Sequence, residues 1–115
     1  MERTRRLRKG AEFDRVYQKG TVVSGPLLVL RVLPNEGGPT RWGFAVGKRI
    51  SKKSVVRNRI RRRLREAARQ LPVAEGYDIV VTARQPVLQA SFGDIRAALE
   101  RAARRAGILQ EAGEC

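Results

Sequence analysis

The chain has 115 residues, the length of one ordinary domain, and carries a formal net charge of +14 at pH 7. It contains no histidine and one cysteine, which excludes the usual zinc sites, histidine-based catalysis and an internal disulfide. Its acidic residues are scattered and do not suggest a protein-held pair of metal ions. We therefore expect any catalysis that involves this protein to be performed by another molecule.

Two features of the sequence bear on the compartment. No run of about 18 apolar residues is present, and the basic start of the chain lacks the apolar core of a signal peptide. The lone cysteine, Cys115, indicates a reducing environment. We expect a cytoplasmic protein with one domain over residues 1–115 and loose termini at 1–6 and 108–115.

The first predicted element is a short helix over residues 11–18, which ends before Gly20. Phe13, Val16 and Tyr17 lie on one side of this helix, near basic residues. An apolar side of this kind usually packs on a core, but aromatic rings beside cations also stack on unpaired bases. Both interpretations of Phe13 and Tyr17 remain open.

Strands are predicted next. Residues 27–33 are almost all apolar and predict a central strand, and 21–24 predict a short strand before it. Arg31 is the one charge in 27–33 and should point to the open face of the sheet. Turn residues at 34–39 predict a hairpin to a strand over 41–46, where large and small side chains alternate. The small face of this last strand indicates that another element packs closely against it.

The most informative stretch is an amphipathic helix predicted over residues 53–71, with Ser54 as its N-cap and Pro72 after its end. Its apolar side chains form one narrow stripe: Val56, Ile60, Leu64, Ala67 and Leu71. Between positions 48 and 69 there are eleven basic residues and one acid. A solvated face normally mixes both signs, and a membrane-bound helix needs a wide apolar face. The pattern instead indicates binding to nucleic acid phosphates, which arginine contacts through paired hydrogen bonds.

After this helix, the sequence predicts a strand over 77–83, a connector with some helical character over 87–90, and a final helix between Ser91 and Gly107. Ser91 and Asp94 form an approximate capping box. The fold class is α/β (α+β), a single small domain of approximate order α-β-β-β-α-β-α with a mixed sheet. A strand-helix-strand order alone favours a right-handed crossover.

Four motifs together resemble the protein subunit of bacterial ribonuclease P, over nearly the whole chain. They are Phe13-x-x-Val16-Tyr17-x-x-Gly20, Arg41-x-Gly43-Phe44-Ala45-Val46-Gly47-Lys48-Arg49, Val56-Arg57-Asn58-Arg59-Ile60-x-Arg62-x-Leu64-Arg65-Glu66 and Asp78-Ile79-Val80-Val81-x-Ala83-Arg84. The resemblance implies a small sheet with helices on one side, similar to a ribosomal protein domain, and a left-handed crossover around the basic helix. It also implies that a large RNA removes the 5′ leader from precursor tRNA, with Mg²⁺ held mainly by that RNA.

The resemblance implies two groups of binding residues, with no catalytic or metal-binding residue in the protein. The first group contacts the catalytic RNA: Lys52, Lys53, Arg57, Asn58, Arg59, Arg61, Arg62 and Arg65. The second group lines the site of the single-stranded leader: Phe13, Tyr17, Arg31, Lys48 and Arg49. Because some members carry an aromatic residue where this chain has Arg31, a phosphate contact is expected there. The implied partners are the catalytic RNA and precursor tRNA, and oligomerisation of the protein is not required.

Three other functions remain open from the residues alone. A structural RNA-binding protein of the ribosome or another ribonucleoprotein has the same composition and would co-purify with ribosomal subunits in high salt. A DNA-binding helix protein would bind duplex DNA as tightly as structured RNA. A protein-only nuclease would cleave RNA after all nucleic acid had been removed.

Overall fold

The computed structural model describes residues 5–8 and 10–110, and every structural statement below refers to these residues. In chain order the elements are α1 (Ala11–Lys19), β1 (Thr21–Ser24), β2 (Leu28–Pro34), β3 (Arg41–Ala45), α2 (Ser54–Arg69), β4 (Tyr77–Ala83), the 3₁₀ helix η2 (Gln85–Gln89) and α3 (Phe92–Ala106). This order confirms the predicted succession of helices and strands, including the short first strand.

The four strands form one mixed sheet in the order β1-β2-β4-β3. β2 is antiparallel to β1 and to β4, whereas β3 and β4 are parallel. The hairpin expected between β2 and β3 is wrong, because β4 lies between them. β4 is apolar on both faces, with Ile79, Val80 and Val81 all fully buried, so an interior position removes the most apolar surface from water.

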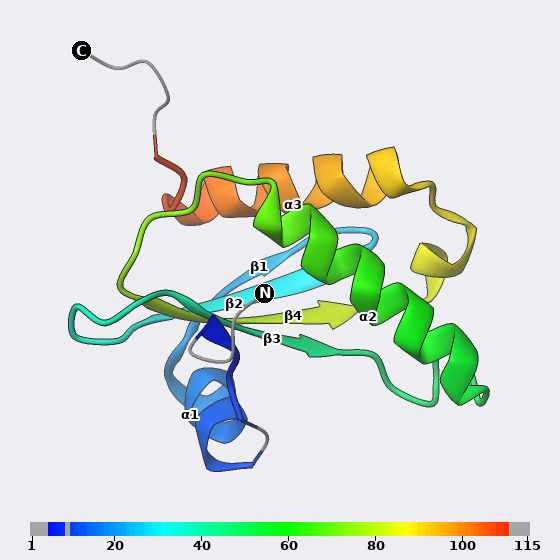
Figure 1. Cartoon of the computed structure of the whole chain (residues 1–115), viewed down its shortest axis with the longest axis horizontal. Helices are drawn as coiled ribbons and strands as arrows, with labels where there is room; N and C mark the ends of the chain where they lie inside the picture. Colours follow the sequence, from blue (N-terminus) through cyan, green and yellow to red (C-terminus); the bar gives the residue numbers. More distant parts are fainter. Residues whose placement is uncertain (1–4, 9, 111–115) are drawn as a thin grey trace.

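Two helices cover one face of the sheet and the third lies against the other face (Figure 1). The chain leaves β3, runs through α2 on the near side and returns in the neighbouring parallel strand β4, which makes the crossover left-handed, as the resemblance implies. α2 and α3 pack side by side on this face. The expectation that all helices lie on one side is wrong, because the apolar side of α1 packs on the opposite face around Val16 and Val80.

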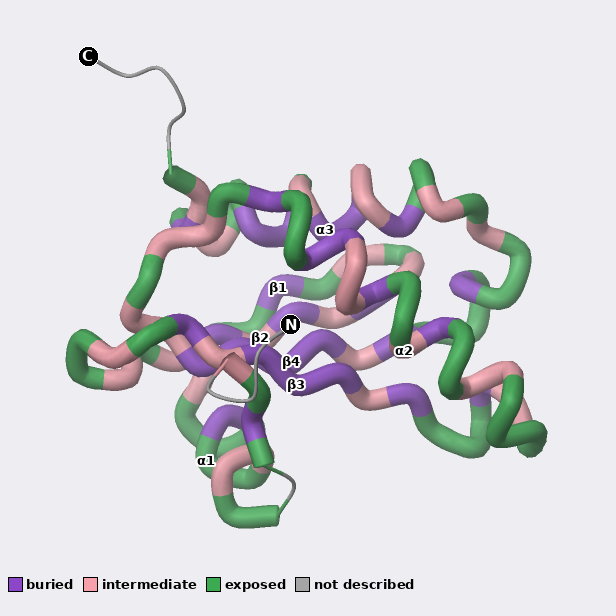
Figure 2. Tube along the Cα trace, viewed as in Figure 1, coloured by how far each residue is buried: buried purple, intermediate pink, exposed green. Residues whose placement is uncertain are grey.

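The core follows the alternation of side chains along the strands. Leu28, Leu30 and Val32 of β2 are buried in the large cluster beneath α2 and α3, together with the predicted apolar stripe of α2. The intervening residues of β2 face α1 and are less buried. Figure 2 shows that buried positions concentrate in the central strands and along the inner sides of the helices. The predicted amphipathic character of α2 therefore attaches it to the core along one side only.

An ion-pair network holds α1 in place over the sheet. Arg41 donates from Nε and Nη2 to the two carboxylate oxygens of buried Asp78, at 2.9 and 2.7 Å, and from Nη1 to Glu12 of α1 at 3.2 Å. Burial by itself would raise the pKa of Asp78, but hydrogen bonds from Arg41 and Asn35 outweigh it and lower that pKa below its ordinary value. The carboxylate therefore stays ionised inside the fold and keeps Arg41 in position.

Both ends of the described chain are more ordered than the sequence suggested. Arg6 forms a parallel bridge with Trp42 of the edge strand β3, and Leu109 forms an antiparallel bridge with Val73. Ile108 is only 2% exposed. The prediction of loose termini is therefore wrong for Arg5, whose side chain pairs with Glu75, and for Arg6 and 108–110, because otherwise unpaired backbone groups bind these segments. The remaining positions of that prediction, 1–4 and 111–115, lie outside the described residues.

The helix ends agree only partly with the predicted caps. The N-cap of α2 is Lys53, whose side chain makes no capping hydrogen bond, and Ser54 is already helical, so its predicted capping role is wrong. The capping box of α3 is confirmed, since Ser91 Oγ accepts from the backbone N–H of Asp94 at 3.0 Å and Asp94 accepts in return. Gly107 ends α3 in a left-handed conformation with a φ of 75°.

Candidate RNA interface

The outer face of α2 carries arginines without intramolecular partners. Arg59 and Arg62 are exposed and form no hydrogen bond or ion pair within the described part of the chain. Arg65 is half-buried, its guanidinium lies 6.0 Å from the centre of the Phe44 ring, and its Nε is buried without a hydrogen-bond partner. Burial lowers the pKa of Arg65, and the charges of Arg6 and Arg61 lower it further. A bound phosphate would relieve this repulsion.

Arg57, Asn58 and Arg61, also predicted to bind RNA, have a structural role that the sequence did not indicate. Arg57 Nη1 donates to the carbonyl oxygens of two residues in the loop before α2, Ser51 and Lys52, at 2.9 Å each. Arg61 donates to Asn58 Oδ1 at 2.8 Å and to the carbonyl oxygen of Val46, at the start of that loop, at 3.3 Å. These side chains fasten the basic loop to the helix while leaving further N–H groups available to a ligand.

The loop between β3 and α2 presents four exposed cations. They are Lys48, Arg49, Lys52 and Lys53, and none of their side chains forms a hydrogen bond or ion pair within the described residues. Lys52 and Lys53 directly precede α2, where they extend its basic face. The structure places Lys48 and Arg49 in the exposed turn that follows β3.

Tyr17 and Arg31 meet on the face of the sheet that carries α1. The Tyr17 side chain is exposed, and its ring centre lies 4.8 Å from the guanidinium carbon of Arg31. Tyr17 Oη is 3.4 Å from Thr82 Oγ1, to which Arg31 Nη1 donates at 3.5 Å. Arg31 therefore points to the open face, as predicted. Thr82 was missed, since a lone threonine in an apolar strand gives no sequence signal.

Phe13 packs directly on β3. A Cβ atom added at Gly43 would lie 2.3 Å from Phe13 Cζ, so only glycine leaves room for the ring. This contact confirms that an element lies close against the small face of β3. The Phe13 and Tyr17 rings are tilted by 48° with centres 6.4 Å apart. Phe13 is thus a packing residue with one accessible side, whereas Tyr17 is the more exposed ring.

A groove along the β3 edge connects the arginine face of α2 with the aromatic side of α1. It consists of two hollows of about 200 and 310 Å³, and both are lined by Phe13, Phe44 and Arg61. Arg6 and Arg65 line the first hollow. Sequence reasoning missed Arg6, although the apolar Leu7 beside it, buried in the structure, was a signal that this segment docks. Phe13 of the predicted leader group therefore lines the same groove as Arg61 and Arg65 of the predicted RNA-binding group.

The described residues contain no group of three or more histidine, cysteine, aspartate or glutamate side chains that could hold a metal ion. The same part of the chain contains no helix that is long and apolar enough to cross a membrane. Arginine and lysine side chains are the most frequent charged groups on this surface, which favours ligands rich in negative charge.

Comparisons with known proteins agree on one family. The family profile described as Ribonuclease P matches residues 1–107. The ribonuclease P protein component of Symbiobacterium thermophilum is 45% identical over 116 residues, covering 98% of this chain and 100% of that protein. The corresponding protein of Roseiflexus castenholzii is 42% identical, with coverages of 97% and 93%.

Solved structures lead to the same conclusion. The RNase P protein of Staphylococcus aureus superposes with a TM-score of 0.81 at 31% identity, covering 92% of this chain and 98% of that chain. The RNase P protein of Thermotoga maritima has a TM-score of 0.78 at 25% identity, with coverages of 87% and 96%. With a family match over nearly its whole length and relatives above 40% identity, the chain belongs to the ribonuclease P protein family.

Proposed function

We propose that this protein is the RNA-binding subunit of a ribonuclease P in which it helps a catalytic RNA remove the 5′ leader from precursor tRNA. The observation that supports this most is the groove along β3, which joins an arginine face to an aromatic and basic face. Two polyanions could lie on these adjoining surfaces, one on each side of the groove. A protein that binds a single structured RNA needs only one such surface.

The α2 face and the loop before it would bind the catalytic RNA. Arg59, Arg62 and Arg65 have guanidinium groups free for phosphates, and Lys52 and Lys53 add charge at the start of the helix. Arg57, Asn58 and Arg61 would act partly by keeping the loop in its binding conformation. Such contacts with phosphates make binding strongly dependent on salt, because each one releases condensed counterions.

The leader would bind along the groove and over the face that carries α1. Tyr17 offers a ring for stacking, Arg31 a charge for a phosphate, and Phe13 one side of its ring at the groove. Lys48 and Arg49 would contact the leader at the border of the sheet. Contacts made by stacking and charge tolerate a variable sequence, as a leader of changing composition requires.

We assign catalysis to the RNA, since the proposed binding surfaces present mainly arginine, lysine and aromatic side chains. Mg²⁺ would be held mainly by that RNA and would supply the chemistry of cleavage. The protein would contribute charge: a surface of +14 reduces repulsion between catalyst and substrate, so less Mg²⁺ is needed to hold them together.

The decisive experiment measures 5′ cleavage of a precursor tRNA by a bacterial ribonuclease P RNA at low Mg²⁺, with and without this protein. We expect the protein to restore cleavage at the correct site and to be inactive alone. If it binds both RNAs and restores nothing, a structural RNA-binding role replaces the proposal. Cleavage by the protein alone, after removal of all nucleic acid, would establish a protein nuclease.

Leader binding is tested best at Tyr17, because Phe13 also contributes to packing. Tyr17→Ala should weaken binding of leader-bearing precursor by roughly fivefold or more and leave mature tRNA unchanged, since stacking contributes about 1–3 kcal/mol per base. Tyr17→Phe keeps the ring and is the matched control. Equal losses for precursor and mature tRNA would remove Tyr17 from the leader site.

A further inference from the structure

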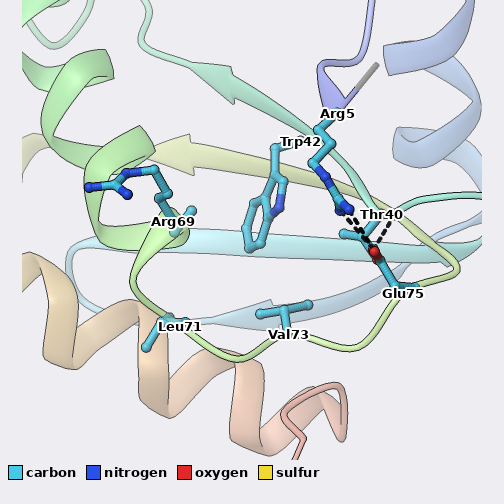
Figure 3. A pocket seen from close by; sticks show the side chains of 8 residues that line it. Arg5, Thr40, Trp42, Arg69, Leu71, Val73 and Glu75 are labelled. Atoms are coloured by element: carbon cyan, nitrogen blue, oxygen red, sulfur yellow. Dashed lines mark hydrogen bonds and ion pairs between the residues drawn. The ribbon is translucent and has the colours of Figure 1, made fainter. Parts of the chain in front are cut away.

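A larger cavity, not used by the proposed function, lies between the start of β3, the end of α2 and the connection from α2 to β4 (Figure 3). Its volume is about 620 Å³. Apolar side chains form one part of its wall: Trp42, Ala68, Leu71 and Val73. Polar side chains form the other part: Arg5, Thr40, Arg69 and Glu75. Concave sites of this size with apolar walls and a few polar groups are typical of binding sites for small molecules.

Trp42 gives this cavity an unused hydrogen-bond donor. The residue is only 6% exposed and stacks on Phe44, with ring centres 5.9 Å apart and planes 3° from parallel. No described residue accepts a hydrogen bond from its indole N–H. In Figure 3 the indole projects between Arg69 and the Arg5–Glu75 pair, with its nitrogen on the side of that pair. The indole nitrogen is not one of the buried side-chain atoms that lack a partner, so this donor is accessible from the cavity and available to a ligand that brings an acceptor.

Glu75 supplies an acceptor at the same cavity. Its Oε1 accepts from Arg5 Nη1 at 2.8 Å and from the backbone N–H of Thr40 at 2.9 Å, whereas Oε2 accepts from Arg5 Nη2 alone among the described residues, at 2.7 Å. These contacts, that of Arg5 first, lower the pKa of Glu75 to about 2, so the carboxylate is ionised at neutral pH. Because a carboxylate oxygen has more than one lone pair, Oε2 can accept again from a ligand N–H.

The charges at the cavity are balanced. Arg5 is paired with Glu75 at 2.7 Å, and Arg69 is paired with Glu66 at 2.6 Å. A free phosphate would therefore gain little net attraction here, in contrast to the unpaired arginines on α2. An uncharged heterocycle with both an acceptor and an N–H donor on its edge fits the apolar walls and both polar groups.

We propose that this cavity binds one unpaired nucleobase of an RNA partner, packed against Trp42 and Val73, with its pairing edge toward the indole N–H and Glu75. The inference rests on the proposed function only in that it requires RNA to be the partner. The base belongs either to the catalytic RNA or to the precursor tRNA. It adds recognition of the pairing edge of one base to a protein that otherwise contacts RNA through phosphates and stacking.

The first test uses the fluorescence of Trp42, the one tryptophan of the chain. Titration with adenosine or cytidine 5′-monophosphate should change the emission in a saturable way, whereas ribose 5-phosphate at equal ionic strength should not. Val73→Phe fills the cavity and should weaken nucleotide binding about tenfold or more. Val55→Phe, at a position 74% exposed and outside the cavity, is the matched control and should bind like the unmodified protein.

Two results overturn the inference: no saturable change with either nucleotide, or an equal change with ribose 5-phosphate. Circular dichroism shows whether Val73→Phe is folded. If it is not, Ala68→Leu blocks the same cavity from the α2 side and is expected to have the same effect on binding.

The second test identifies the source of the base and separates this inference from the proposed function. Dimethyl sulfate probing of both RNAs should show an adenine or cytosine edge protected by the protein but not by Val73→Phe, and the RNA with that protection supplies the base. If the protein stimulates cleavage but the unmodified protein and Val73→Phe give identical protection patterns, the cavity inference fails while the proposed function stands. If the protein binds nucleotides at Trp42 but stimulates no cleavage, the proposed function fails and the cavity remains a base-binding site.

Discussion

The contact between Gly43 and Phe13 leads to a quantitative prediction for how α1 is held on the sheet. In Gly43→Ala the new Cβ would lie 2.3 Å from Phe13 Cζ and 2.7 Å from Cε1. Carbon atoms normally approach no closer than about 3.5 Å, so the ring must retreat by about 1 Å. Overpacking of this kind typically destabilises a protein by about 1–3 kcal/mol. We expect Gly43→Ala to lower the free energy of unfolding by an amount in this range.

A double-mutant cycle with Phe13→Ala isolates the contact. Without the ring, Gly43→Ala should change the free energy of unfolding by less than about 0.5 kcal/mol, because the three atoms nearest to the new methyl group all belong to that ring and alanine suits a strand no worse than glycine. The coupling between the two substitutions should therefore reach about 1 kcal/mol or more. Urea unfolding followed by far-ultraviolet circular dichroism gives the four free energies.

The control is Gly93→Ala, at the start of α3. There an added Cβ would be 3.7 Å from its nearest neighbour, Ser91 Oγ, which is ordinary contact. This substitution should be neutral or stabilising by up to about 1 kcal/mol, since alanine favours a helix. Equal losses for Gly43→Ala with and without the Phe13 ring would refute the reasoning, because the cost would then arise from the strand and not from the docking of α1.

Three further predictions concern charge and capping. Replacing Arg59, Arg62 and Arg65 by alanine should reduce the slope of log K against log salt for binding the catalytic RNA by about 2 to 3, and an unchanged slope would contradict their phosphate contacts. Contacts of Glu75, first with Arg5 and then with the Thr40 N–H, lower its pKa from an ordinary 4.5 to about 2. The stability that this carboxylate contributes above pH 4.5 is therefore lost as the pH falls toward 2. In Glu75→Gln the melting temperature should fall less steeply over this pH range, and equally steep curves for both proteins would show that Glu75 does not contribute to the pH dependence. Ser91→Ala removes the acceptor of the α3 capping box and should cost about 1 kcal/mol in urea unfolding, whereas Ser91→Thr should retain most of it.

The local elements and the charged face of α2 were predictable from the sequence. Helical spacing of Ile60 and Leu64 fixes which side of α2 is buried, and the excess of arginine on the other side follows without any tertiary contact. The cap of α3 was predictable for the same reason, because Ser91 and Asp94 interact across a single turn. The family resemblance added the left-handed crossover, which strand order alone would have predicted incorrectly.

Only the tertiary structure determined which segments far apart in the chain meet. The position of β4 between β2 and β3, the docking of α1 on the face opposite α2, and the approach of Arg6 to Arg65 all depend on contacts between distant residues. Trp42 and Glu75, which are far apart in the sequence, likewise line the same cavity. Periodicity specifies which side of an element is apolar, but several partners can cover that side, and the whole fold selects the one that buries the most apolar surface while pairing the buried polar groups.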